Sequence, residues 1–197
     1  MNSTKATVRT YFKYSYSTFT QPVLNKYGDF GGSSFSVQSN SEVGVGYAWC
    51  MFDGLNQAAA VWVGLLSATP YVTFYNPVPL KVTKLTIANS ASYAVKGGNV
   101  KGSNDNSNWT TIKTFTNANV TANATWDIDM SSNTASYKYY RITCTSSNGG
   151  TYAYIGECTI TAQQRNVVAG TSSSYDYYED LPTYYYTKSG TTYYCTK

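Results

Sequence analysis

The residue types that most often act as catalysts are absent or scattered in this chain. The 197 residues include no histidine, which excludes Ser-His-Asp and Cys-His catalysis and any histidine-based metal site. Asp127 and Asp129 stand two positions apart, so they would share one face of a strand. Two carboxylates can hydrolyse a glycosidic bond, but this pair lies beside the polar turn Met130-Ser131-Ser132. A glycosidase pair stays formally open, while a solvated surface is favoured, and we expect no enzymatic activity.

The cysteines leave two chemical possibilities open. None of the four, Cys50, Cys144, Cys158 and Cys195, has the CxxC spacing of a zinc site. Cys144 and Cys158 each fall in a run that is typical of a buried strand. Buried free thiols are expected if the protein assembles in a reducing cytosol, and a Cys144–Cys158 disulfide is the alternative.

The composition points to a surface that is polar without being charged. Charged residues make up 12% of the chain, whereas tyrosine occurs 21 times. The net charge of +4 is spread without a basic run, so we expect no nucleic-acid binding. No apolar stretch reaches the roughly 18 residues of a membrane helix, so we expect no membrane insertion.

The N-terminal residues 1–5 contain no apolar segment of the kind found in secretory signals. Synthesis in a host cytoplasm is therefore expected. An extracellular role would then need another route outward, such as phage lysis, and a cleaved precursor is the alternative.

The elements that would position any site are short strands. Hydrophobic residues recur with a period of two, and clusters of Gly, Asn, Ser and Pro separate the runs, which favours an all-β sandwich or barrel. The segment Ala48–Phe52 is compatible with one helical turn. The expected strands are Thr7–Thr18, Phe35–Gln38, Tyr71–Tyr75, Lys81–Ala88, Asn99–Gly102, Thr110–Phe115, Ala124–Ile128, Tyr139–Thr145 and Ile155–Ala162.

Burial patterns are visible in two of these strands. Residues 140, 142 and 144 would share one face. Between Val82 and Leu85 the apolar phase slips once, which predicts a bulge near Thr83 or a strand that is buried on both sides.

Two flanks fall outside the central body. Residues 1–31 would form an N-terminal arm with an alternating strand, and residues 164–197 a tyrosine-rich tail. In the tail, Thr183–Lys188 and Thr191–Thr196 flank Ser189-Gly190, which suggests a hairpin. Arg165–Ser174 is interpreted as a linker.

Between the flanks, residues 32–163 resemble the discoidin domain, also called the coagulation-factor C-type or galactose-binding-like domain. The resemblance rests on a series of segments in the family's order. It implies a jelly-roll β-sandwich whose ligands bind to loops at one rim. The segments are Ser33–Val37, Ala48-Trp49-Cys50-Met51-Phe52-Asp53-Gly54, Trp62, Tyr71–Phe74, Val82–Asn89, Gly102-Ser103-Asn104-Asp105, Tyr139–Ile142 and Ile155–Ile160.

The resemblance also implies a structural calcium site. Asp53 and Glu157 match the positions at which family members hold Ca²⁺, together with backbone carbonyls. Calcium takes six to eight oxygen ligands, so these two carboxylates would only anchor the ion. The alternative is that Asp53 caps its own turn and that Glu157 makes ordinary polar contacts.

A glycan-binding rim needs aromatic faces for stacking and polar side chains for sugar hydroxyls. The implied rim loops are Gln38–Tyr47, Gly64–Pro70, Asn89–Lys96 and Ser146–Tyr154. The candidate ligand-binding residues in them are Tyr47, Tyr93, Asn148, Tyr152 and Tyr154. Trp49 and Trp62 are expected to lie in the core rather than to contact a ligand, and Trp109 is expected to pack on the sandwich.

The combined expectation is a non-enzymatic protein of a phage virion, a tail or head fibre component that binds a host-surface carbohydrate. The flanking strands would support self-association or docking to other virion proteins, because unpaired strand edges are templates for pairing. The alternatives are a structural decoration or filament subunit without glycan binding, and a secreted bacterial adhesin domain with an extracellular or cell-surface location.

Overall fold

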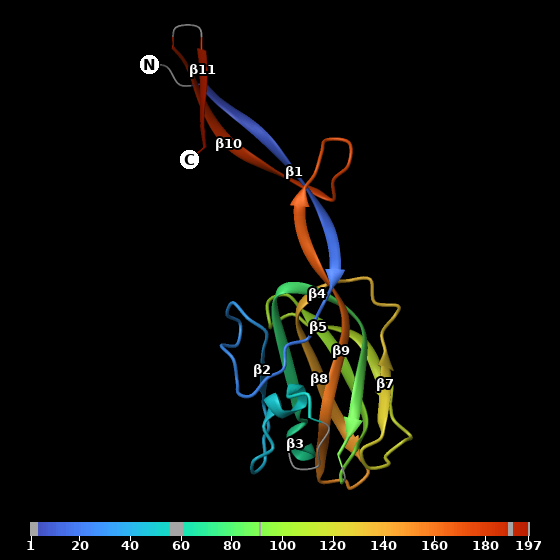
Figure 1. The fold of residues 1–197 in the computed structure, drawn as a ribbon. Coiled ribbons are helices and arrows are strands. Elements are labelled where there is room, and N and C mark those ends of the chain that lie inside the picture. Colours follow the sequence, from blue (N-terminus) through green and yellow to red (C-terminus); the bar gives the residue numbers. More distant parts are fainter. Residues whose placement is uncertain (1–3, 56–60, 91, 189–190, 197) are drawn as a thin grey trace. The chain divides into compact units, whose positions relative to one another are not determined.

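In a computed structural model, the protein consists almost entirely of β-strands (Figure 1). The structure describes residues 4–55, 61–90, 92–188 and 191–196, with side chains for 9–55, 61–90 and 92–179. The chain divides into two compact units. Residues 17–165 form the body, and residues 1–16 with 166–197 form the terminal sheet.

The body is a β-sandwich made of short and long antiparallel strands, as the alternating pattern predicts. A 3₁₀ helix, η1 (Ala48–Phe52), occupies the segment for which one helical turn was expected, and η2 covers Leu66–Ala68. Within the described residues, no helix is long and apolar enough to cross a membrane. The strands are β2 (Ser36–Ser39), β3 (Trp62–Leu65), β4 (Tyr71–Asn89), β5 (Val95–Ser103), β6 (Thr110–Thr116), β7 (Thr125–Asp129), β8 (Tyr137–Ser147) and β9 (Tyr152–Ala169).

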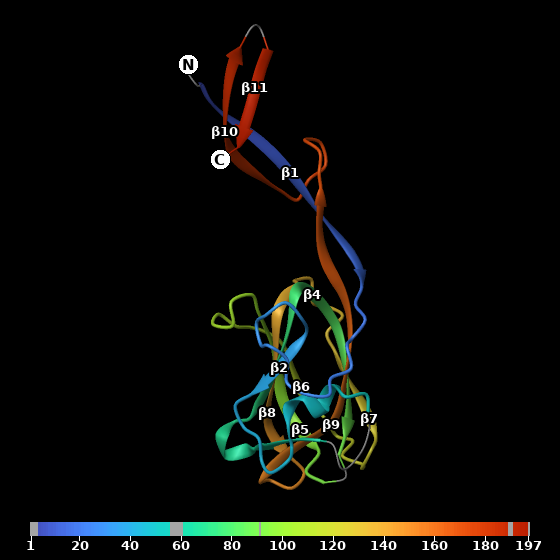
Figure 2. The same ribbon diagram turned by 60° about the vertical axis from the view of Figure 1, so that its left-hand side comes forward.

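The long strand β4 belongs to both layers of the sandwich. Its first part, Tyr71–Tyr75, pairs with β2 and β8, and its second part, from Leu80, pairs with β9 and β7. Pro77 and Pro79 separate the two parts, and because proline has no N–H to donate, the ladder is interrupted there. Figure 2 shows β4 beside β2 and β8 in one layer and beside β9 in the other.

The core between the layers is aromatic and closely packed. Phe74 stacks on Tyr140 at 5.2 Å between ring centroids, with 11° between the ring planes. The hydroxyl of Tyr140 donates to the carbonyl of Leu80 at 2.6 Å, and burial raises the pKa of Tyr140 to about 12. Trp62 is fully buried. Each such side chain contributes about 1.5–3 kcal/mol by leaving water.

The thiols of Cys50, Cys144 and Cys158 are free and buried. The alternative of a Cys144–Cys158 disulfide is therefore wrong. Both side chains point into the apolar core, and burial raises the pKa of both thiols. They act as small core residues.

Several local predictions are confirmed and others are wrong. Residues 140, 142 and 144 are all buried, and the register shift between Val82 and Lys84 leaves Thr83 as the expected bulge. The strands expected at 71–75 and 81–88 are one continuous strand, and β3 was not predicted. The linker expected at Arg165–Ser174 is wrong in its first half, because β9 continues to Ala169.

The terminal sheet joins the two ends of the chain. Strand β1 (Thr4–Thr18) pairs with β10 (Tyr177–Lys188), and β10 pairs with β11 (Thr191–Thr196), all antiparallel. Phe12 stacks on Tyr177 at 5.0 Å, and the ring of Tyr11 lies 4.9 Å from that of Tyr175. The backbone N–H of Tyr14 donates to the carboxylate of Asp176 at 2.6 Å. The expected hairpin is thus present.

Candidate functional site

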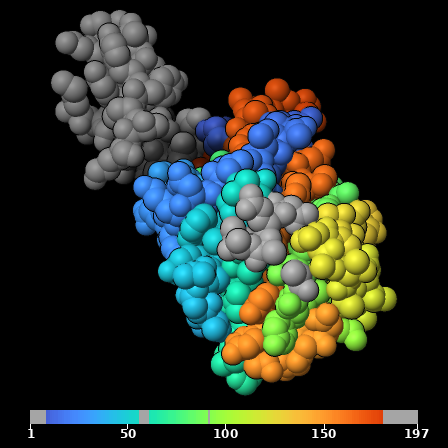
Figure 3. All heavy atoms as spheres, turned by 60° about the horizontal axis from the view of Figure 1, so that its bottom comes forward, coloured from blue at the N-terminus to red at the C-terminus, as the bar shows by residue number. Residues whose placement is uncertain are grey.

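The four loops that the resemblance places at a rim are linked to one another at one end of the body. The backbone N–H of Leu65 donates to the hydroxyl of Ser41 at 3.0 Å, which ties the first loop to the second. Leu66 N–H donates to the carbonyl of Thr151 at 3.0 Å, and Asn148 N–H donates to the carbonyl of Ala94 at 3.1 Å. Figure 3 shows the surface of the second loop in teal, the third in light green and the fourth in orange, side by side.

Three of the candidate tyrosines form one cluster on this rim. The ring of Tyr93 lies 5.4 Å from that of Tyr152 in a T-shaped arrangement and 5.1 Å from that of Tyr154. The rings of Tyr152 and Tyr154 are 6.2 Å apart. All three side chains are partly exposed, and Asn148 is exposed in the adjoining turn. We call these four residues the rim cluster.

Tyr47 lies in a different group of aromatic side chains. Its ring stacks on Trp49 at 6.3 Å and meets Tyr27 edge-on at 6.2 Å. Glu42 accepts hydrogen bonds from the Tyr27 hydroxyl and, at 2.9 Å, from the backbone N–H of Ala48. Burial and the hydrogen bond with Glu42 raise the pKa of Tyr27. Trp49, which was expected in the core, is partly buried and packs against it. Its stacking on the exposed Tyr47 is a feature that sequence reasoning missed.

The rim cluster offers neutral groups for recognition. Partial burial, then the neighbouring phenols Tyr93 and Tyr152, raise the pKa of Tyr154, so its hydroxyl stays protonated at neutral pH. The aromatic faces can stack on the C–H surface of a sugar ring, while phenol and amide groups can bond its hydroxyls. The four residues of the cluster include no carboxylate and no imidazole.

Asp53 and Glu157 come together on the body, although 104 positions separate them in the sequence. Asp53 follows η1, is 8% exposed, and accepts a hydrogen bond from the N–H of Leu55 at 2.8 Å. Glu157 lies on β9, and its Oε2 atom is buried without a hydrogen-bond partner. Burial, and then the charge of Asp53, raise the pKa of Glu157 to about 8. At neutral pH the pair therefore retains a proton on Glu157.

This pair has the chemistry of a site for a hard cation. A buried carboxylate oxygen without a donor, next to a second carboxylate, is a costly arrangement that positive charge would relieve. Among the described residues, no group of three or more His, Cys, Asp or Glu side chains is close enough to hold a metal. The remaining ligands of an ion would thus be neutral oxygens such as backbone carbonyls, which calcium accepts. The residues present fit such an ion.

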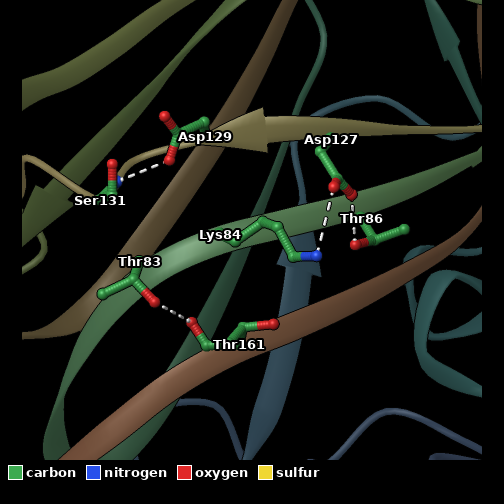
Figure 4. A network of polar contacts seen from close by, with 7 residues as sticks. All are labelled: Thr83, Lys84, Thr86, Asp127, Asp129, Ser131 and Thr161. Atoms are coloured by element: carbon green, nitrogen blue, oxygen red, sulfur yellow. Dashed lines mark hydrogen bonds and ion pairs between the residues drawn. The ribbon is translucent and has the colours of Figure 1, made fainter.

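Asp127 and Asp129 are engaged in other contacts (Figure 4). Asp127 accepts a hydrogen bond from the Thr86 hydroxyl at 2.6 Å and pairs with Lys84 at 3.2 Å. Asp129 accepts from the backbone N–H of Ser131 at 2.9 Å, which caps the turn after β7. These contacts lower the pKa of both carboxyl groups. Both are therefore ionised above acidic pH, and neither is suited to donate a proton as a general acid.

The sequence profile of the F5/8 type C domain matches residues 36–158, a range that includes Asp53, Glu157 and the rim cluster. The chain belongs to the F5/8 type C domain family. The terminal sheet lies outside the range that matches this family. No curated protein matches the chain.

Solved structures share the fold of the F5/8 type C domain at low sequence identity. One is a family 32 carbohydrate-binding module from Clostridium perfringens in complex with GalNAc-β-1,3-galactose, with TM-score 0.55, 14% identity, and coverage of 64% of this chain and 94% of that one. A second, the family 32 module of C. perfringens NanJ in complex with galactose, has TM-score 0.53, 16% identity, and coverage of 64% and 92%. An F5/8 type C domain from Bacteroides fragilis has TM-score 0.55, 14% identity, and coverage of 76% and 97%. Carbohydrate-binding modules are a non-catalytic type of domain, although some are attached to glycoside hydrolases.

Proposed function

We propose that the protein is a non-catalytic carbohydrate-binding protein that recognises a neutral glycan through the rim cluster. One observation carries this proposal. The ring centroids of Tyr93, Tyr152 and Tyr154 lie 5.1–6.2 Å apart on hydrogen-bonded rim loops, and Asn148 lies in the adjoining turn. The family 32 modules with the same fold were solved with galactose or a galactose-containing disaccharide, which supports a sugar as the ligand class. Tyr47 and Trp49 form a separate aromatic group, which would be a second place for an aromatic contact with a sugar ring.

A glycan array followed by calorimetry tests the proposal. Tyr152→Ala removes one wall of the rim cluster, and we expect it to weaken binding by about tenfold or more. Tyr175→Ala is the matched control, because this tyrosine is 43% exposed but lies in the terminal sheet. Binding that survives in Tyr152→Ala and also in Tyr93→Ala would refute the site, and a wild-type protein that binds no glycan would refute the function.

We propose further that Asp53 and Glu157 hold a structural calcium ion. The ion would supply the positive charge that the buried Oε2 of Glu157 lacks and would fix the turn at Gly54 against β9. Calcium should raise the thermal unfolding midpoint of the wild-type protein at neutral pH, relative to the same protein in a chelator. An unchanged midpoint at millimolar calcium would exclude the ion.

For the biological setting we propose a phage virion, in which the protein is a tail or head fibre component and the terminal sheet mediates self-association or docking. The terminal sheet is narrow and carries aromatic side chains such as Phe12 and Tyr177, and it has little to bury them against on its own. Light scattering should show an oligomer for the full chain and a smaller species when residues 177–196 are deleted. Equal masses would count against an assembly role for the terminal sheet. A glycan array separates the fibre component from a structural subunit that binds no glycan.

A further inference from the structure

The backbone of Tyr93 has an uncommon conformation. Its φ is +54°, in the left-handed region that large side chains rarely occupy because Cβ approaches the backbone. Tyr93 immediately precedes Ala94, whose carbonyl accepts the N–H of Asn148, and its own carbonyl accepts the N–H of Tyr154 at 3.0 Å. The surrounding structure therefore holds this residue in place. Strain of this kind is retained chiefly where it places a group for function.

The ring of Tyr93 lies on the backbone of Gly149. A Cβ atom built at Gly149 would be 2.1 Å from Cδ1 and 2.3 Å from Cε1 of Tyr93. These distances are shorter than any real contact, and the atoms belong to a rigid ring rather than to the end of a flexible chain. Only glycine at 149 allows the ring to lie where it meets Tyr152 and Tyr154.

Gly150 offers a direct contrast. It has φ +78°, but a Cβ atom there would meet nothing within 4 Å. The hydroxyl of Ser147 accepts the N–H groups of both glycines, at 3.4 and 3.2 Å. The two residues thus belong to one turn. Gly150 adopts the positive φ that the turn requires, and Gly149 leaves space for the Tyr93 ring.

We propose that Gly149 and the left-handed backbone of Tyr93 are positioning elements that fix the Tyr93 ring in the rim cluster before a ligand arrives. This inference rests on the proposed function. A platform that is already ordered avoids the entropy cost of immobilising a side chain on binding. Gly149 contributes no side chain to the ligand, so its effect on affinity would pass entirely through Tyr93.

Four variants of the full chain test the proposal: Gly149→Ala, Gly150→Ala, Tyr93→Asn and the double variant Gly149→Ala with Tyr93→Asn. Asparagine tolerates the left-handed backbone, so Tyr93→Asn removes the ring with little change to the turn. We expect Gly149→Ala to weaken binding of the best array glycan by about tenfold and Gly150→Ala by about twofold or less. Gly149→Ala should also lower the thermal midpoint in the wild-type background and leave it unchanged in the Tyr93→Asn background.

The outcomes separate this inference from the function it rests on. If the wild-type protein binds glycan but Gly149→Ala and Gly150→Ala weaken binding equally, the positioning role is overturned while the function stands. The same holds if Gly149→Ala lowers the midpoint equally with and without the Tyr93 ring. If the wild-type protein binds no glycan, the proposed function fails and the positioning role falls with it.

Discussion

Replacing Glu157 by glutamine should change the pH dependence of stability. In the folded protein the pKa of Glu157 rises from 4.5 to about 8, chiefly through burial and then through the charge of Asp53. The folded state therefore binds a proton that the unfolded state releases. Stability from this group is fully present below about pH 4.5 and is lost as pH rises through about 8. Glutamine has the same shape without the charge, so Glu157→Gln should not show this loss.

The size of the effect follows from the pKa shift and the exposure. Each pKa unit corresponds to about 1.36 kcal/mol. Glu157 is only partly buried, so solvent screening reduces the full figure, and we expect the wild-type protein to lose about 2 kcal/mol between roughly pH 5.5 and pH 8. The chain has no histidine, which removes the usual titration in this range.

Urea unfolding in the presence of a chelator measures this difference. The free energy of unfolding of Glu157→Gln should be close to that of the wild-type protein at the lower pH and about 2 kcal/mol higher at the upper pH. Buried thiols affect both proteins alike and cancel in the comparison. Parallel pH profiles for the two proteins would refute the assignment of a retained proton to this pair. Calcium at the upper pH should restore stability to the wild-type protein and have less effect on the variant.

Three further predictions concern the body. Phe74→Ala removes a fully buried ring stacked on Tyr140 and should lower the free energy of unfolding by about 3–5 kcal/mol in urea titrations; a loss below about 1 kcal/mol would contradict the described core. Asp127→Asn breaks an ion pair whose side chains are 41% and 49% exposed, so its cost should stay within about 1 kcal/mol by the same assay. Gln21→Ala removes the amide that bonds Cys158 O at 3.0 Å and Ile160 N at 2.7 Å; we expect a loss of about 1–3 kcal/mol and faster hydrogen exchange at Ile160, and unchanged exchange there would count against this contact.

The alternation of apolar and polar residues was sufficient to predict the strands that have one face buried in the core. In β8 the apolar residues Tyr140, Ile142 and Cys144 are all buried, as is Thr143 between the last two, and the slip at Thr83 is a bulge. Strand β3 gave no such signal, because it has four residues and includes Gly64. A Cβ atom at Gly64 would come within 2.5 Å of Pro70 and 2.6 Å of Trp62. Glycine there reflects close packing, which only the tertiary structure reveals.

The candidate site shows the same division between local and long-range information. Residue chemistry and the family's loop order were enough to select Tyr93, Asn148, Tyr152 and Tyr154, which the structure brings together. The contact of Tyr27 with Tyr47 depends on the path of residues 22–28, for which the sequence carries no periodic pattern. Contacts of this kind depend on which loops pack against each other in the folded chain, and no short sequence motif predicts them.

One irregularity in β9 connects the two parts of the candidate site. Pairing with β4 shifts between Ile155, which is opposite Asn89, and Glu157, which is opposite Ala88, so Gly156 is an extra residue. Before the shift the buried positions are 153 and 155, and after it they are 158, 160 and 162. Without the extra residue, the alternation would place Glu157 in phase with Ile155, inside the apolar core. The bulge instead keeps Glu157 on the same side as Tyr152 and Tyr154, where it can meet Asp53. A glycine within a strand pattern is a known signal of a bulge. Gly156 is therefore the residue in the sequence from which this bulge could have been predicted.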